Sequence, residues 1–164
     1  MPRILIADDE ASQRELLGGF LRSLGFEVVE AADGVEAVAR VREAGPDLAL
    51  LDQRMPRLGG AEAVRALREV QPDLDIVVIT AFASVEEAVA ALKIGATDYL
   101  MKPLDLDRLQ IVIRKALERQ TLLRVEGLRA RGHRVEVAAP PDGGLAARLG
   151  GRVHPLPAGA DPRL

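Results

Sequence analysis

Hydrophobic positions in residues 1–120 follow two alternating patterns. Short apolar runs lie at Arg3–Ala7, Phe26–Glu30, Leu48–Leu51, Asp75–Thr80 and Asp98–Met101, and each is typical of a strand buried on both faces. Between these runs, apolar residues recur at every third or fourth position, which predicts amphipathic helices. Five strands in strict alternation with helices predict an α/β protein, in which a parallel sheet forms a doubly wound, three-layer sandwich.

Residues that begin or end helices flank each helical repeat. Ser12, with Glu15 three residues later, has the spacing of a capping box. Ser84 and Asp105 are expected to cap the fourth and fifth helices. The residues expected to face the core are Leu16, Leu17, Phe20, Leu21 and Leu24, then Val35, Ala37, Val38 and Val41, then Ala63, Val64, Leu67 and Val70, then Val85, Ala88, Val89 and Leu92, and finally Leu106, Leu109, Ile113 and Leu117.

Polar residues with compatible chemistry stand where the predicted strands end. Because parallel strands share one carboxyl edge, Asp8, Asp9, Asp52, Thr80 and Lys102 are expected to converge there. Clustered carboxylates repel one another, and a hard cation with oxygen ligands, such as Mg²⁺, would compensate them. The threonine and lysine could then donate to phosphoryl oxygens. Each residue also has an ordinary alternative, as a helix cap, a strand former or a solvated surface lysine.

Composition narrows the class of protein further. The 164 residues include no cysteine, which excludes disulfides and thiolate metal sites. No apolar run approaches the roughly 20 residues of a membrane span, and no signal sequence is recognisable, so a cytoplasmic protein without membrane contact is expected. Residues 121–164 carry seven arginines but no interleaved aromatic residues, so no direct binding to nucleic acid is expected.

These residues resemble the receiver domain of a bacterial two-component response regulator. The matching motifs are the Asp8-Asp9 pair, Asp52 followed by Met55-Pro56 and Gly60, Thr80-Ala81, and Lys102-Pro103. The resemblance covers roughly residues 1–120 and implies a flavodoxin-like fold with the parallel strand order 2-1-3-4-5. It also implies a cis peptide bond before the proline, since proline makes the cis form accessible.

The resemblance implies that Asp52 accepts a phosphoryl group from a sensor histidine kinase. Asp8, Asp9, the Asp52 carboxylate and the backbone carbonyl of Arg54 would hold Mg²⁺, and Lys102 would bind a phosphoryl oxygen. The chain would be a phosphoacceptor signalling domain rather than an enzyme that turns over a substrate.

The resemblance also implies a conformational output. Thr80 would bind the phosphoryl group and move, and Tyr99 would swing inward with it. The signalling surface would be residues 84–119, with Ile94 and Leu104 as exposed apolar contacts. Bulky residues two positions after the phosphoacceptor and two after the threonine would make loss of phosphate slow, and here they are Arg54 and Phe82.

The chain is predicted to divide into a receiver domain (residues 1–120), a linker helix (121–132) and an irregular or disordered tail (133–164). One helix could run from Ile111 to Arg131, similar to receivers of activators that work with the alternative sigma factor, where this helix pairs in a homodimer. The tail departs from that family because it has no phosphate-binding loop. In residues 133–139, polar and apolar side chains alternate, which predicts a strand.

Two other functions compete with the phosphoacceptor hypothesis. Phosphatases of the haloacid-dehalogenase type also use a strand-end Asp nucleophile with Mg²⁺, but they need a second Asp two residues later, where this chain has Arg54. A binding scaffold independent of phosphate would have no need for all five strand-end residues.

Overall fold

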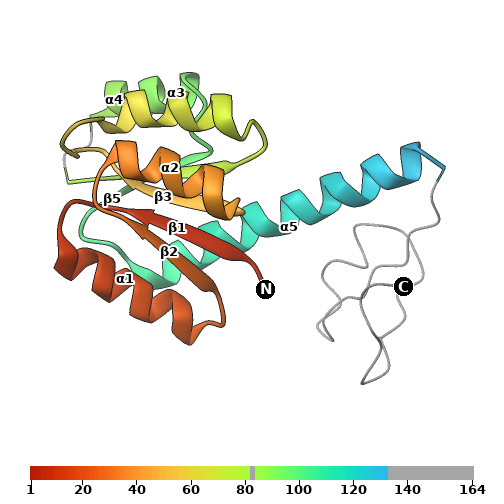
Figure 1. The fold of residues 1–164 in the computed structure, drawn as a ribbon, viewed down its shortest axis with the longest axis horizontal. Coiled ribbons are helices and arrows are strands. Elements are labelled where there is room, and N and C mark those ends of the chain that lie inside the picture. Colours follow the sequence, from red (N-terminus) through yellow and green to blue (C-terminus); the bar gives the residue numbers. More distant parts are fainter. Residues whose placement is uncertain (82–83, 133–164) are drawn as a thin grey trace. The chain divides into compact units, whose positions relative to one another are not determined.

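The computed structural model describes residues 1–81 and 84–132. The predicted alternation of strands and helices is confirmed (Figure 1). The elements are β1 (Arg3–Ala7), α1 (Ala11–Ser23), β2 (Glu27–Ala31), α2 (Gly34–Ala44), β3 (Leu48–Asp52), α3 (Gly60–Val70), β4 (Asp75–Thr80), α4 (Val85–Lys93), β5 (Asp98–Met101) and α5 (Leu106–Ala130).

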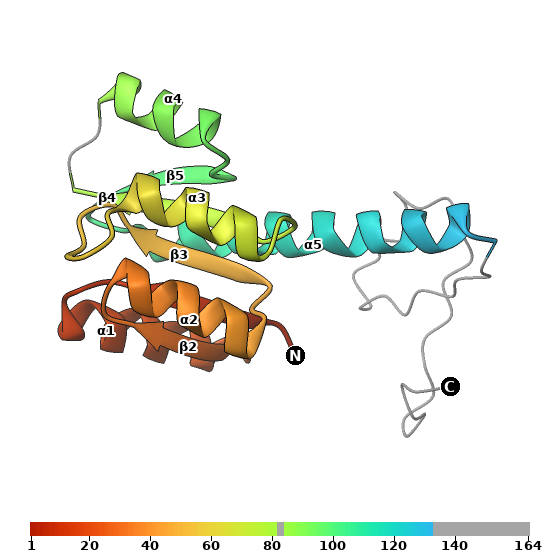
Figure 2. The same ribbon diagram turned by 45° about the horizontal axis from the view of Figure 1, so that its top comes forward.

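All neighbouring strands pair in parallel, in the order β2-β1-β3-β4-β5, as predicted. The two central strands β3 and β4 are buried along their whole length, because helices cover both faces of the sheet. In Figures 1 and 2, α2 and α3 lie on one face with α4 near the β5 edge, while α1 and the first part of α5 cover the other face. The fold therefore brings the ends of β1, β3, β4 and β5 to one edge.

Two aliphatic clusters fill the spaces between the layers. One joins the sheet to α2, α3 and α4, and includes Ala37, Val64 and Leu67. The other joins the sheet to α1 and α5, and includes Leu21 and Ile113. Burying a side chain of this size contributes about 1.5–3 kcal/mol, so these clusters supply most of the driving force for folding.

The predicted helix caps are partly confirmed. The Ser84 hydroxyl accepts from the Glu87 N–H at 3.1 Å, and Asp105 accepts from the N–H groups of Asp107 and Arg108. The prediction of a capping box at Ser12 is wrong. Helix α1 begins one residue before Ser12, with Glu10 at the cap position and no side-chain cap bond.

Five side chains expected to face the core are exposed instead: Leu16, Val35, Val85, Val89 and Leu92. In α1, Leu17 and Leu21 lie on the buried face of the helix. Leu16 is rotated from Leu17 by about 100° around the helix axis and so points away from that face. In α4, only Ala91 is buried. Its neighbour β5 is a four-residue edge strand, which offers too little surface to cover the apolar side of the helix.

Helix α5 has 25 residues and ends at Ala130, one residue short of the predicted end. The polypeptide divides inside this helix, after Leu117, into two compact units. The predicted strand at residues 133–139 and the predicted tail lie outside the described residues. Among the helices that the structure describes, none combines the length and the apolar character of a membrane span.

Candidate metal and phosphoacceptor site

The parallel register places the expected site residues at one edge of the sheet. Ala7, the last residue of β1, pairs with Leu51, and Asp52 follows at the end of β3. Thr80, the last residue of β4, pairs with Met101, and Lys102 comes next in the chain. Four separate strands therefore contribute to one small region, as the sequence predicted.

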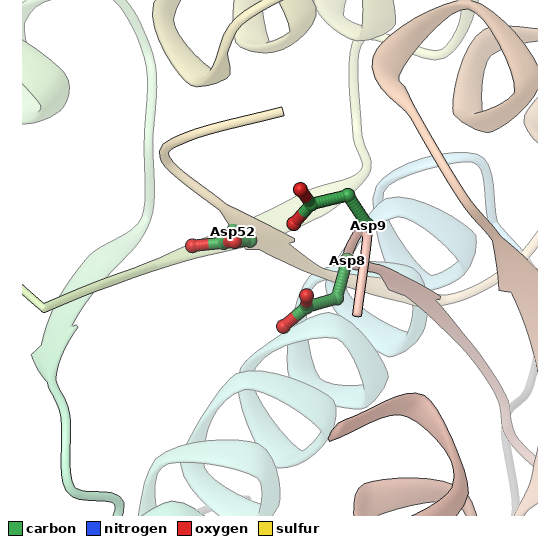
Figure 3. A group of neighbouring side chains, drawn as sticks. All are labelled: Asp8, Asp9 and Asp52. Carbon is green, nitrogen blue, oxygen red and sulfur yellow. The ribbon is translucent and has the colours of Figure 1, made fainter. Parts of the chain in front are cut away.

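Three carboxylates meet at this edge. Asp8, Asp9 and Asp52 each offer one oxygen, and these oxygens all lie within 4.8 Å of one another. Figure 3 shows the side chains facing a common space from the ends of β1 and β3. Asp8 and Asp52 are 4% and 8% exposed, whereas Asp9 is open to solvent. The group is therefore partly desolvated but accessible from outside.

One lysine lies beside the two buried carboxylates. The Lys102 Nζ atom is 3.6 Å from Asp8 Oδ2 and 3.5 Å from Asp52 Oδ1. The other oxygen of Asp8, Oδ1, accepts from the Glu10 N–H at 2.9 Å. The Arg14 guanidinium donates to the backbone carbonyl of Asp8 at 2.7 Å. These contacts fix the orientation of the Asp8 carboxylate before any ligand binds.

The pKa of Asp52 is raised above its ordinary value. Burial is the main cause, and the negative charge of Asp8 is the next. Lys102 and the backbone N–H of Arg54 act in the opposite direction but do not cancel these effects. The single positive charge of Lys102 therefore does not balance the three carboxylates. Three carboxylates with a solvent-accessible side are a donor set that fits Mg²⁺, which keeps several of its waters.

The raised pKa of Asp52 predicts a stability difference that depends on pH. An acid with a higher pKa in the folded state binds its proton more tightly there, so stability falls as pH rises from about 3.8 through the folded-state pKa. We expect Asp52→Asn to remove this loss, so that without divalent cations the variant is the more stable protein at pH 7. Urea unfolding at pH 4 and pH 7 measures this. A variant less stable than wild type at pH 7 would contradict it.

Thr80 ends β4, and Tyr99 lies on the neighbouring strand β5. Thr80 is 2% exposed, and its backbone carbonyl accepts from the Lys102 N–H at 2.7 Å. Tyr99 is half-buried, and its hydroxyl donates to Oε1 of Gln53 at 3.0 Å. Sequence reasoning missed Gln53, because a glutamine after a strand carries no recognisable signal of such a contact.

The peptide bond before Pro103 and the exposure of Ile94 and Leu104 were also predicted from the sequence. The peptide bond between Lys102 and Pro103 is cis, as predicted. Ile94 and Leu104 were expected to be exposed, but both are half-buried, since each packs against one of the two core clusters. Phe82 lies outside the described residues.

The parallel sheet, with an acidic cluster and a lysine at its carboxyl edge, places this chain among the open α/β proteins, a class that binds ligands at the strand ends. The sequence matches the family described as "Response regulator receiver domain" over residues 4–114. The chain belongs to that family.

Relatives and solved structures agree with this membership. The chain is 46% identical over 114 residues to the transcriptional regulatory protein ZraR of Salmonella typhimurium, covering 70% of this chain and 26% of the relative. It is 39% identical over 120 residues to the regulatory protein AtoC of Escherichia coli, covering 73% of this chain and 26% of that protein. A receiver domain structure from Clostridium thermocellum matches with a TM-score of 0.72 and 30% identity, covering 75% of this chain and 99% of that one.

These comparisons support the coarse functional assignment made from the sequence. The chain is a receiver domain of a two-component response regulator, and receivers of this family are signalling domains that interact with histidine kinases. The resemblance to receivers of alternative-sigma-factor activators fits ZraR and AtoC. The matched region spans 26% of the length of each of these two relatives.

Proposed function

We propose that Asp52 is the phosphoacceptor of this receiver and takes its phosphoryl group from a phosphohistidine on a sensor histidine kinase. The observation that carries the proposal is the position of Asp52 at the end of β3, beside Lys102 and two further carboxylates. An Asp52 oxygen would form a bond to phosphorus while the bond from phosphorus to the histidine nitrogen breaks, and the imidazole leaves.

Each neighbouring residue has a role in this proposal. Asp8, Asp9, the Asp52 carboxylate and the Arg54 carbonyl would hold Mg²⁺. Bound Mg²⁺ would neutralise charge on the phosphoryl oxygens. Lys102, already 3.5 Å from Asp52, would donate to another of those oxygens.

The proposed output is a shift between two conformations. Thr80 would donate to the phosphoryl group, and Tyr99 would move with it and change the surface formed by residues 84–119. Tyr99 would give up its bond to Gln53 in doing so. The proposed consequence is control of an effector, in keeping with the transcriptional regulators among the relatives.

Assembly and location are further parts of this proposal. Helix α5 would pair with a second copy in a homodimer, and no direct contact with nucleic acid or membrane is proposed for this chain. The proposed location is the cytoplasm. The division into residues 1–120, 121–132 and 133–164 stays a prediction.

Slow loss of the phosphoryl group also stays a prediction. Arg54 is exposed beside the site, and its side chain could restrict the approach of hydrolytic water. We expect Arg54→Ala to lose phosphate faster than wild type. Following the phosphorylated fraction over time by intact mass measures this, and an unchanged rate would assign no shielding to Arg54.

Incubation with acetyl phosphate and Mg²⁺, followed by intact mass, tests the proposed function. We expect one phosphoryl adduct, and none when a chelator replaces the cation. Turnover of acetyl phosphate without an adduct would favour a phosphatase of the haloacid-dehalogenase type. No reaction at all would favour a binding scaffold that is independent of phosphate. Either result would overturn the proposal.

A further inference from the structure

The loop between Asp52 and α3 contains a backbone conformation that is unfavourable for the residue adopting it. Arg57 has a φ of 67°, in the left-handed region that favours glycine. The Leu58 N–H donates to the Pro56 carbonyl at 2.8 Å, so these three residues form a γ-turn. Turns of this kind with a positive φ are rare and strained. Neighbouring contacts must therefore stabilise the loop.

The first of these contacts is a two-point ion pair. Arg57 Nε donates to Asp33 Oδ2 at 2.9 Å, and Nη2 donates to Oδ1 at 3.1 Å. Asp33 is the cap of α2, where its Oδ1 also accepts from the Glu36 N–H at 2.8 Å. The cap bond orients the carboxylate for the guanidinium, and the hydrogen bond from Arg57 lowers the pKa of Asp33.

The second contact is a close approach of two backbones. A Cβ atom at Gly34 would lie 2.7 Å from the Cβ of Leu58 and would overlap the Leu58 carbonyl oxygen. Only glycine permits this distance. Leu58 and Met55, from the same loop, pack against the cluster that joins the sheet to α2, α3 and α4. The N-terminus of α2 and the loop therefore touch at two adjacent points.

The other end of the loop is attached to the sheet. The Gln53 N–H donates to the Ile79 carbonyl at 2.9 Å, and the Gln53 carbonyl accepts from the Gly60 N–H at 3.0 Å. Arg54 lies between this anchored residue and the turn at Arg57. Its backbone N–H lies close enough to the Asp52 carboxylate to lower the pKa of that group. The conformation of the turn thus limits where the Arg54 backbone can lie.

We propose that Asp33 and Arg57 are positioning residues for the phosphoacceptor site. Their ion pair holds the strained turn, and the turn holds the backbone of Arg54 against Asp52. The part of this inference that concerns Mg²⁺ rests on the proposed function, because the Arg54 carbonyl is a proposed ligand. The part that concerns the loop does not, since it applies to the protein without metal.

Two substitutions test the ion pair from its two sides. Asp33→Ser removes the carboxylate but keeps a good helix cap, and Arg57→Gln removes the charge from the turn. Arg40→Gln is the matched control, because Arg40 forms exposed ion pairs with Glu36 and Glu43 on the same helix. Amide hydrogen exchange of residues 54–59 without metal reports the loop, and calorimetric titration with Mg²⁺ reports the site.

We expect both test variants to exchange faster in residues 54–59 and to bind Mg²⁺ about two- to fivefold more weakly, the range typical of an exposed ion pair. High salt screens the ion pair between Asp33 and Arg57, so it should accelerate exchange in wild type and in the control. It should have little further effect on the test variants, because they lack this ion pair. Unchanged exchange or unchanged Mg²⁺ affinity in both variants would overturn the inference.

Intact mass after acetyl phosphate separates this inference from the proposed function. If wild type forms no adduct, the proposed function fails, while the exchange data still decide whether Asp33 and Arg57 hold the loop. If wild type forms the adduct and the variants behave like Arg40→Gln in exchange and Mg²⁺ binding, only the inference fails.

Discussion

Asp52→Asn is expected to abolish the phosphoryl adduct that acetyl phosphate and Mg²⁺ form on the wild-type chain. An amide has nearly the shape of the carboxylate but is not a nucleophile toward phosphorus, so the reaction should stop without loss of the fold. The site has other carboxylates, but Asp8 is held by the Glu10 N–H and Asp9 is open to solvent. Neither has the position at the end of β3 beside Lys102 that supports the proposal for Asp52.

The matched control for this experiment is Asp73→Asn. Asp73 is an exposed carboxylate in the turn before β4, away from the three clustered acids. Its substitution removes the same charge and should leave the adduct intact. Circular dichroism of both variants checks the fold. If Asp52→Asn formed the phosphoryl adduct in the same yield as wild type, another residue would be the one modified. The assignment of Asp52 as the phosphoacceptor would then be overturned.

Asp9→Asn is expected to weaken Mg²⁺ binding by on the order of tenfold or more, because the affinity of an oxygen-ligand site depends strongly on its number of charged ligands. Asp9 is the exposed member of the cluster and offers an oxygen within 4.8 Å of those of Asp8 and Asp52. Calorimetric titration of the unphosphorylated protein gives the dissociation constant. The rise in melting temperature with added Mg²⁺ should shrink in parallel.

Glu10→Gln is the control for the metal experiment. Glu10 is the next residue along the chain, is exposed, and makes no side-chain cap bond to α1. It lies outside the cluster of three carboxylates. If both substitutions weakened Mg²⁺ binding equally, the effect would come from the general negative charge of this edge. The assignment of Asp9 as a ligand would then be withdrawn.

Local patterns in the chain were sufficient to predict the sheet and the convergence of the site residues. The apolar runs at Leu48–Leu51 and Asp75–Thr80 mark central strands, because a strand buried on both faces cannot contain many polar residues. Parallel alternation then brings Asp52, Thr80 and Lys102 to one edge. The exposure of the apolar residues on α4 could not be predicted in this way, since it depends on how much surface the edge strand β5 offers.

Residue order and hydrophobic periodicity were enough to predict five strands alternating with helices, because each element follows from interactions within its own segment. The carboxylates at the sheet edge followed from one general rule, that parallel strands share a carboxyl edge. The pairing of Arg57 with Asp33, 24 residues away, and of Tyr99 with Gln53, 46 residues away, emerged only from the folded chain. Such contacts join side chains that are far apart along the chain, at separations that follow neither the helix nor the strand repeat. Their geometry depends on how the loops pack, and no local pattern records it.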